Sequence, residues 1–374
     1  MEELGLDYAL LYPTIGLVTL NHPDAELRVA AARAFNSYYA EAYAGYRDRL
    51  EPVAVVPTMT PGEAVAELRH AVQVLGLKTA VMSGVVPREV RPDGSRRNWI
   101  DTLDHGSLHD YDPLWAACTE LKVAPSFHGV GMGWGTRTSR SNYVFNHIGS
   151  FATAQEPICR SLIMGGAPAR FPALRFSFLE GGVAWAAQLL GDTIGHWSKR
   201  NRDAIGQFDP LNIDLELASD LFGRHARGSL ADYAGAFAAS MKAFREQTPR
   251  MDPLDEFEAA RFGCAADIVA LFRDRFFFGC EADDPMNALA FNRACLPGGV
   301  PLNAMFASDI GHWDVPDMLD VLPEAWELVQ DGRISEPEFA DFTCNNIARL
   351  LTGANPAFFD GTAVAGRVSV LVSK

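Results

Sequence analysis

Four runs of strand-like sequence each end in a side chain that can bind a metal ion or move a proton. His128 lies in "SFHG", Glu180 in "FLEGG", Glu281 in "GCEADD" and Asp309 in "FASD". Imidazole and carboxylate groups are ligands for zinc or manganese. Such an ion lowers the pKa of a bound water to roughly 7, or polarises a substrate carbonyl or carboxylate. Turn chemistry explains one acidic strand end, but four in succession predict a single site.

We assign His128, Glu180 and Asp309 to one divalent metal, with zinc ahead of manganese. Asp309, helped by His128 and His312, is the expected catalytic group, because a carboxylate can act both as a ligand and as a proton donor or acceptor. Glu281 is expected to bind substrate. In this interpretation the substrate is a small-molecule carboxylate.

Three further side chains are expected to contact the substrate. Arg137, in the glycine-rich loop after His128, could hold a substrate carboxylate with two parallel hydrogen bonds; a solvated loop is the alternative. Trp134 could form the floor of an aromatic pocket, or simply pack in the core. His147, in "NYVFNHIG", lies near the same strand ends.

The elements that must position these residues alternate between apolar runs and amphipathic helices. Seven runs have strand character: 7–13, 52–57, 77–84, 122–129, 173–182, 275–284 and 302–309. Strand-helix alternation predicts parallel strands with crossover helices. The chain has no GxGxxG or GxxxxGK[ST] motif, so a TIM (β/α)8 barrel is favoured over an open doubly wound sheet. Its strand ends converge on one rim.

Composition excludes some partners. The 374 residues carry a formal charge of −15, which argues against nucleic-acid binding. No apolar stretch reaches the roughly 18 residues that a membrane span needs. The acidic segment "MEELGLDYALLYPT" has no basic n-region, so we do not expect it to be a signal peptide. Scattered cysteines without a CxxC pair suggest a cytoplasmic protein. We expect residues 1–374 to form one barrel domain with a mainly helical insertion at about 200–262, assembled as a homodimer or higher homo-oligomer.

The motifs "SFHG", "RFPALRFSFLEGG", "FASDIGH" and "NPAFFDGT", in this order, resemble the amidohydrolase-related (amidohydrolase 2) family, in particular the branch around aminocarboxymuconate semialdehyde decarboxylase. The resemblance implies a metal-dependent TIM barrel that hydrolyses or non-oxidatively decarboxylates a small unsaturated or aromatic carboxylic acid. It also implies that His128 is the family's metal or substrate histidine on the fifth strand, and Asp309 its aspartate on the eighth.

Two departures from the family pattern leave a second interpretation open. No His-x-His pair precedes "GLDYALLYP", so either the start codon lies further upstream or the first strand is missing or replaced. Glu180 stands where many relatives have histidine. The alternative is therefore a metal-poor, catalytically weak barrel that binds a ligand or partner. We expect the gap in the barrel to be filled by the terminal "RVSVLVS" as a strand, by a partner chain or by the amino-terminal segment, because unpaired sheet edges are normally covered.

Overall fold

The computed structural model describes residues 1–90, 97–249 and 254–372 of the 374-residue chain. Six parallel strands form the main sheet in the order β10–β9–β8–β7–β4–β3. Beside them, β1 and β2 pair in parallel, and β2 leads directly into β3. The strands are β1 Ala9–Leu11, β2 Leu50–Pro52, β3 Ala54–Val56, β4 Ala80–Met82, β7 Pro125–Phe127, β8 Phe176–Phe178, β9 Phe276–Glu281 and β10 Asn303–Ala307.

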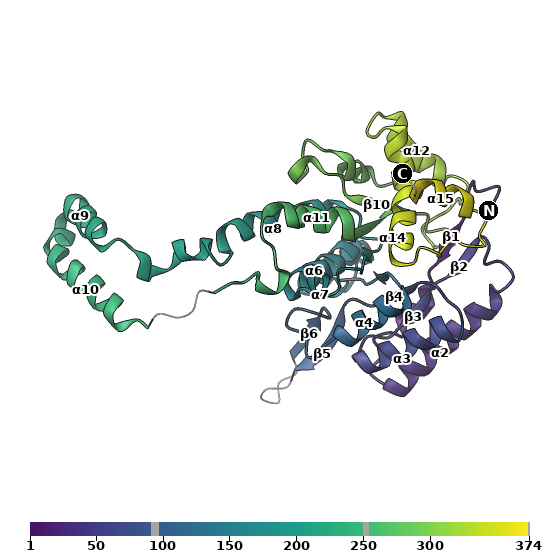
Figure 1. The fold of residues 1–374 in the computed structure, drawn as a ribbon, viewed down its shortest axis with the longest axis horizontal. Coiled ribbons are helices and arrows are strands. Elements are labelled where there is room, and N and C mark those ends of the chain that lie inside the picture. Colours follow the sequence, from purple (N-terminus) through teal and green to yellow (C-terminus); the bar gives the residue numbers. More distant parts are fainter. Residues whose placement is uncertain (91–96, 250–253, 373–374) are drawn as a thin grey trace.

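Helices connect the strands and cover the outside of this wall, which is the arrangement of a TIM barrel (Figure 1). All seven runs predicted to be strands contain a strand. The helices are α1 Thr14–Val18, α2 Ala25–Ala42, α3 Pro61–Gln73, α4 Asp112–Leu121, α5 Tyr143–His147, α6 Ser150–Gly165, α7 Ala167–Arg170, α8 Ala184–Arg200, α9 Leu215–His225, α10 Ala234–Gln247, α11 Ala265–Arg275, α12 Val321–Gln330, α13 Glu336–Ala340, α14 Asn346–Ala354 and α15 Ala365–Val372.

In the main sheet, β3, β4, β7 and β8 are buried throughout and β9 is buried up to Glu281, which is why these strands read as continuous apolar runs. Phe127, Phe178 and Phe278, on the neighbouring strands β7, β8 and β9, stack with ring centroids 5.8 and 5.9 Å apart. They belong to the main core cluster under the helices. Val55 and Val81 pack in a separate cluster. Burying one such aromatic or aliphatic side chain stabilises the fold by roughly 1.5–3 kcal/mol.

The carboxyl-terminal segment packs against β1, but as a helix. Phe358 and Phe359 are buried in a cluster that also contains Val368 of α15 and Phe277 of β9. Tyr8, directly before β1, meets Phe359 edge-on at 5.4 Å. The expectation of a terminal strand is therefore wrong: "RVSVLVS" alternates like a strand, yet one face of helix α15 buries Val368 against the cluster.

A hairpin of β5 Val86–Val90 and β6 Arg97–Asp101 lies outside the seven runs that were predicted to be strands. Arg88 and Asp101 form an ion pair at 3.0 Å, with 8% and 0% of their side chains exposed. Asp101 also accepts hydrogen bonds from the Leu103 N–H and the Ser107 hydroxyl. The hairpin can hold these charged residues in its interior because Arg88 and Asp101 pair with each other there.

The expected helical excursion forms an arm that projects away from the barrel (Figure 1). We define this helical arm as residues 204–249, which include α9 and α10. Neither helix has a buried side chain, and Phe222 stacks on Phe237 at 4.3 Å between them. Within the described ranges, no helix is both long and apolar enough to cross a membrane.

Candidate active site and metal centre

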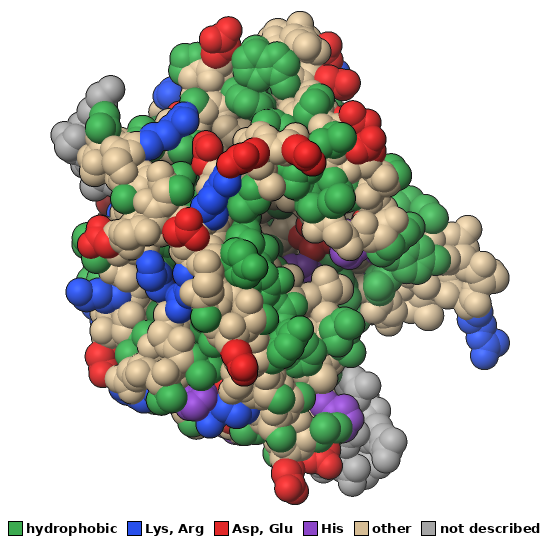
Figure 2. All heavy atoms as spheres, turned by 90° about the vertical axis from the view of Figure 1, so that its right-hand side faces the viewer, with side chains coloured by type: hydrophobic (Ala, Val, Ile, Leu, Met, Phe, Trp, Pro, Cys, Tyr) green, Lys and Arg blue, Asp and Glu red, His purple; other side chains and the backbone are tan. Residues whose placement is uncertain are grey.

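Three carboxylates meet where three neighbouring strands end. One oxygen from each of Glu180, Glu281 and Asp309 lies within 4.8 Å of the other two. Glu281 is the last residue of β9, Glu180 follows β8 and Asp309 follows β10. We call these three residues the carboxylate cluster. A space-filling view shows acidic and histidine side chains inside a hollow bordered by apolar ones (Figure 2).

Two members of the cluster have an unusual backbone conformation. Glu180 has φ +62° and Asp309 has φ +47°, both in the left-handed region that non-glycine residues rarely adopt. Gly279 on β9 makes room for the turn at Glu180, because a Cβ there would lie 3.1 Å from the Glu180 nitrogen. Backbone strain of this kind collects at functional sites, where the surrounding structure holds a side chain in place.

His128 joins the cluster through its side chain. It follows β7 directly, and its N–H donates to the Met82 carbonyl at 3.0 Å. Its Nε2 forms a hydrogen bond with the Glu180 carboxylate, and both side chains are largely buried. The three residues assigned to the metal are therefore close together, and Glu281, expected to bind substrate, lies among them.

The cluster is short of positive charge. Partial desolvation and then the charges of Glu180, Asp309, Asp283 and Asp314 raise the pKa of Glu281 from 4.5 to about 7, although its side chain is exposed. Desolvation, and next the charge of Glu180, also raises the pKa of Asp309. A bound cation would relieve this repulsion, so the donor set fits a divalent metal ion.

His312 lies on the loop that carries Asp309. Its N–H donates to the Asp309 carbonyl at 2.9 Å, and its Nδ1 forms a hydrogen bond with the Asp314 carboxylate. This hydrogen bond raises the pKa of His312, with the negative charges of Asp314, Asp309 and Glu180 adding to the effect. A protonated imidazole is thereby favoured beside the cluster.

The three other residues that were expected to contact the substrate make contacts within the protein. The Arg137 guanidinium donates to the Ile148 carbonyl at the end of α5, so it ties its own loop together. Trp134 packs against the main core cluster. His147 stacks on Tyr143 at 5.0 Å and meets Phe151 edge-on at 5.4 Å, and Phe151 in turn meets His128 at 5.7 Å.

The sequence analysis did not single out Tyr143, Phe151 or Trp313 for the site. Trp313 meets Tyr143 at 6.1 Å, which joins the loop after β10 to the loop after β7. A signal was present in the sequence: "NYVFNHIGSF" concentrates rings around His147, and Trp313 directly follows His312.

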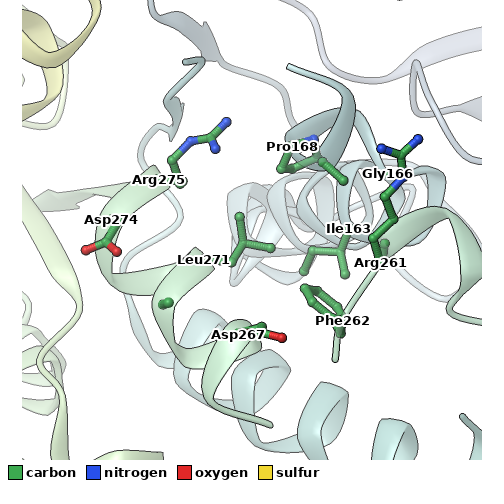
Figure 3. Close-up of a pocket in the computed structure, with 12 residues that line it drawn as sticks. Ile163, Gly166, Pro168, Arg261, Phe262, Asp267, Leu271, Asp274 and Arg275 are labelled. Carbon is green, nitrogen blue, oxygen red and sulfur yellow. The ribbon is translucent and has the colours of Figure 1, made fainter. Parts of the chain in front are cut away.

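A groove of about 400 Å³ lies away from the carboxylate cluster (Figure 3). It is bounded by α6, α7 and α11, and Asp274 and Arg275 line it before the start of β9, at the end opposite to Glu281. Burial lowers the pKa of Arg275 to about 10. Its guanidinium donates to the backbone carbonyls of Leu174 and Phe171, so Arg275 holds chain segments together at this end of the barrel.

Solved structures with similar folds include 2,6-dihydroxybenzoate decarboxylase from Rhizobium, at 17% identity and TM-score 0.54, with 94% of this chain and 86% of that one covered. A dihydroxybenzoic acid decarboxylase from Polaromonas sp. JS666, solved with manganese and the inhibitor 2-nitroresorcinol, has 16% identity and TM-score 0.54, covering 94% and 83%. An amidohydrolase from Mycobacterium avium subsp. paratuberculosis K-10 has 19% identity and TM-score 0.55, covering 94% and 71%.

At these identities the structures support the fold. The family assignment comes from the sequence itself, because the amidohydrolase family model matches residues 3–211, more than half of the chain. Together with the parallel barrel and the cluster at its strand ends, this match shows that the chain is a metal-dependent enzyme of the amidohydrolase family.

Proposed function

We propose that the protein is a non-oxidative decarboxylase of a small aromatic carboxylic acid. The observation that carries the proposal is the convergence of Glu180, Glu281 and Asp309 within 4.8 Å, with His128 bonded to Glu180. The names of two similarly folded proteins, which are decarboxylases of dihydroxybenzoic acids, support the choice of substrate class.

Glu180, Glu281 and His128 are the main metal ligands in this proposal, and Asp309 contributes one oxygen. Manganese is the cation that we propose, ahead of the zinc favoured by the sequence, because a donor set dominated by carboxylate oxygens suits it. When bound, the cation supplies positive charge that polarises a carboxylate or phenolic oxygen of the substrate.

Asp309 moves the proton. Asp309 follows β10 at the edge of the carboxylate cluster, and its protonated carboxyl donates to the ring carbon that bears the substrate carboxylate. A C–H bond forms, the C–C bond to the carboxylate breaks, and its electron pair returns to the ring as carbon dioxide leaves. Asp309 then regains a proton from solvent. His312, held by Asp314 and bonded through its N–H to the Asp309 carbonyl, keeps this loop in position.

The test uses protein incubated with Mn²⁺, desalted and analysed for bound metal, then supplied with 2,6-dihydroxybenzoate and related acids while carbon dioxide is measured. We expect bound manganese and carbon dioxide release. Asp309→Asn should lower the rate by about 100-fold or more, as expected for loss of a general acid. Asp317→Asn is the control, because Asp317 lies on the same loop and its side chain accepts a hydrogen bond from the Leu319 N–H, outside the carboxylate cluster.

Three other results would support a different function or a different mechanism. Protein that takes up no manganese or zinc supports the metal-poor binding barrel. Turnover of an amide or ester without carbon dioxide release supports hydrolysis by the same groups. Full activity of Asp309→Asn would remove Asp309 from the mechanism.

We also propose a homodimer or higher homo-oligomer, supported by the helical arm. Its side chains Leu217, Leu230 and Phe244 are 51%, 58% and 42% exposed, and exposed apolar clusters mark interaction surfaces. Light scattering after size-exclusion chromatography should give a mass above that of one chain, lowered by Leu217→Asp but not by Leu27→Asp on the barrel. A monomeric wild type would contradict this proposal. The cytoplasmic location and the division into one domain with an insertion stay predictions.

A further inference from the structure

An unbroken series of ring contacts runs from the active site to the surface. His128 meets Phe151 at 5.7 Å, Phe151 meets His147 at 5.4 Å, His147 stacks on Tyr143 at 5.0 Å, and Tyr143 meets Trp313 at 6.1 Å. We call Phe151, His147, Tyr143 and Trp313 the aromatic bridge. Its rings on α5 and α6, in the segment between β7 and β8, meet Trp313 on the loop that follows β10, and these two segments also carry His128 and Asp309.

The outer end of the bridge is open to solvent. Tyr143 is 50% exposed and Trp313 is 72% exposed. Large aromatic side chains are usually buried in most of their area, so an exposed pair held in mutual contact differs from isolated surface residues. The two rings meet edge-on, with an interplanar angle of 73°, and their exposed area is available to contact another ring.

Tyr143 and Trp313 are connected to the carboxylate cluster through the residues next to them. Trp313 directly follows His312, whose N–H bonds to the Asp309 carbonyl, and the charge of His147 acts on Asp314. Imidazoles, and carboxylates that hold a cation, can bind the acidic end and oxygen substituents of a substrate, but they offer no apolar surface for its ring. Tyr143 and Trp313 offer that surface.

We propose that Tyr143 and Trp313 bind the ring of an aromatic acid at the mouth of the site and thereby select aromatic over acyclic carboxylates. The inference rests on the proposed function and adds the residues that determine its specificity. Offset or edge-on contacts between rings are favourable beyond simple burial of area, whereas an acyclic carboxylate has no ring to make them.

The experiment measures binding by calorimetry with Mn²⁺-loaded protein and two probes, 2,6-dihydroxybenzoate and the acyclic dicarboxylate fumarate. The variants are Tyr143→Ala and Trp313→Ala. Phe145→Ala is the matched control, because Phe145 lies on α5 and is 55% exposed, but takes part in none of the ring contacts found among the described residues. Since both rings are exposed, their removal should leave the fold intact, which thermal unfolding checks.

We expect Tyr143→Ala and Trp313→Ala each to weaken 2,6-dihydroxybenzoate binding by about five- to tenfold, as loss of an aromatic contact would. Fumarate and Mn²⁺ binding should stay unchanged, and Phe145→Ala should bind both probes like wild type. Trp313→Phe, which keeps a ring, should restore most of the affinity.

Wild-type affinity of both alanine variants for 2,6-dihydroxybenzoate would overturn the assignment of Tyr143 and Trp313 while leaving the proposed function in place. An equal loss of affinity for both probes would also overturn it, because it would reveal a general effect on the site. A wild type that takes up no Mn²⁺ would overturn the proposed function, and this inference with it.

Discussion

Replacing Glu281 by Gln tests the electrostatics of the carboxylate cluster. Partial desolvation and the charges of Glu180 and Asp309 raise the pKa of Glu281 from 4.5 to about 7. In the unfolded chain the carboxyl ionises near its ordinary value. Because its pKa is higher in the folded protein, the folded state holds a proton that the unfolded state has lost between these pH values. The carboxyl therefore lowers the stability of the metal-free protein as pH rises through this window.

The expected change in the free energy of unfolding follows from the same shift in the pKa of Glu281. A difference of this size corresponds to roughly 3 kcal/mol for a fully buried group. The Glu281 side chain is exposed, and solvent screens the charges around it, so we expect about 1 kcal/mol. Glutamine keeps the size of the side chain and has no proton to lose.

The assay is urea unfolding of metal-free wild type, Glu281→Gln and the control Glu327→Gln, an exposed residue on α12, at pH 5 and pH 8. Glu281→Gln should exceed wild type in free energy of unfolding by about 1 kcal/mol at pH 8, and by much less at pH 5. Saturating Mn²⁺ should reverse the order at pH 8, because it binds the wild-type carboxylate better. A difference that is equal at both pH values, with or without Mn²⁺, would refute the reasoning.

Three further predictions concern stability, measured by urea unfolding. Phe358→Ala should cost about 3 kcal/mol, because Phe358 is 1% exposed in the cluster that joins the carboxyl-terminal segment to the barrel; a loss below 1 kcal/mol would contradict that packing. Asp101→Asn should cost about 3 kcal/mol by leaving the buried Arg88 charge unpaired; an unchanged midpoint would show that water compensates it. Lys122→Gly should stabilise the protein by about 0.5–1 kcal/mol, since Lys122 ends α4 at φ +59°; a less stable variant would mean that the lysine side chain contributes there.

Much of the barrel could be predicted from local patterns. Strands buried on both faces read as apolar runs, and each of the seven predicted runs contains a strand. The start of α3 shows another local feature, a capping box in "TPGE": the Glu63 N–H donates to the Thr60 hydroxyl, and the Thr60 N–H donates to the Glu63 carboxylate. Such features depend on residues a few positions apart, so the sequence alone reveals them.

The errors arose where distant contacts overrode local pattern. Residues 366–372 alternate like a strand but form helix α15, because Val368 finds its partners in the cluster around Phe358. The β5–β6 hairpin lies outside the seven predicted strand runs, and it contains the buried ion pair between Arg88 and Asp101, which no local pattern reveals.

The sequence by itself determined that His128, Glu180, Glu281 and Asp309 follow strands, and parallel strands bring such ends to one rim whatever the loops do. Only the tertiary structure decided which groups meet: Glu281 lies with the other carboxylates, and Arg137 bonds to Ile148. The physical reason is that the order of the strands determines where each backbone segment lies, with an uncertainty of a few residues. Side-chain contacts depend on loop conformations, such as the left-handed turns at Glu180 and Asp309, that no local periodicity records.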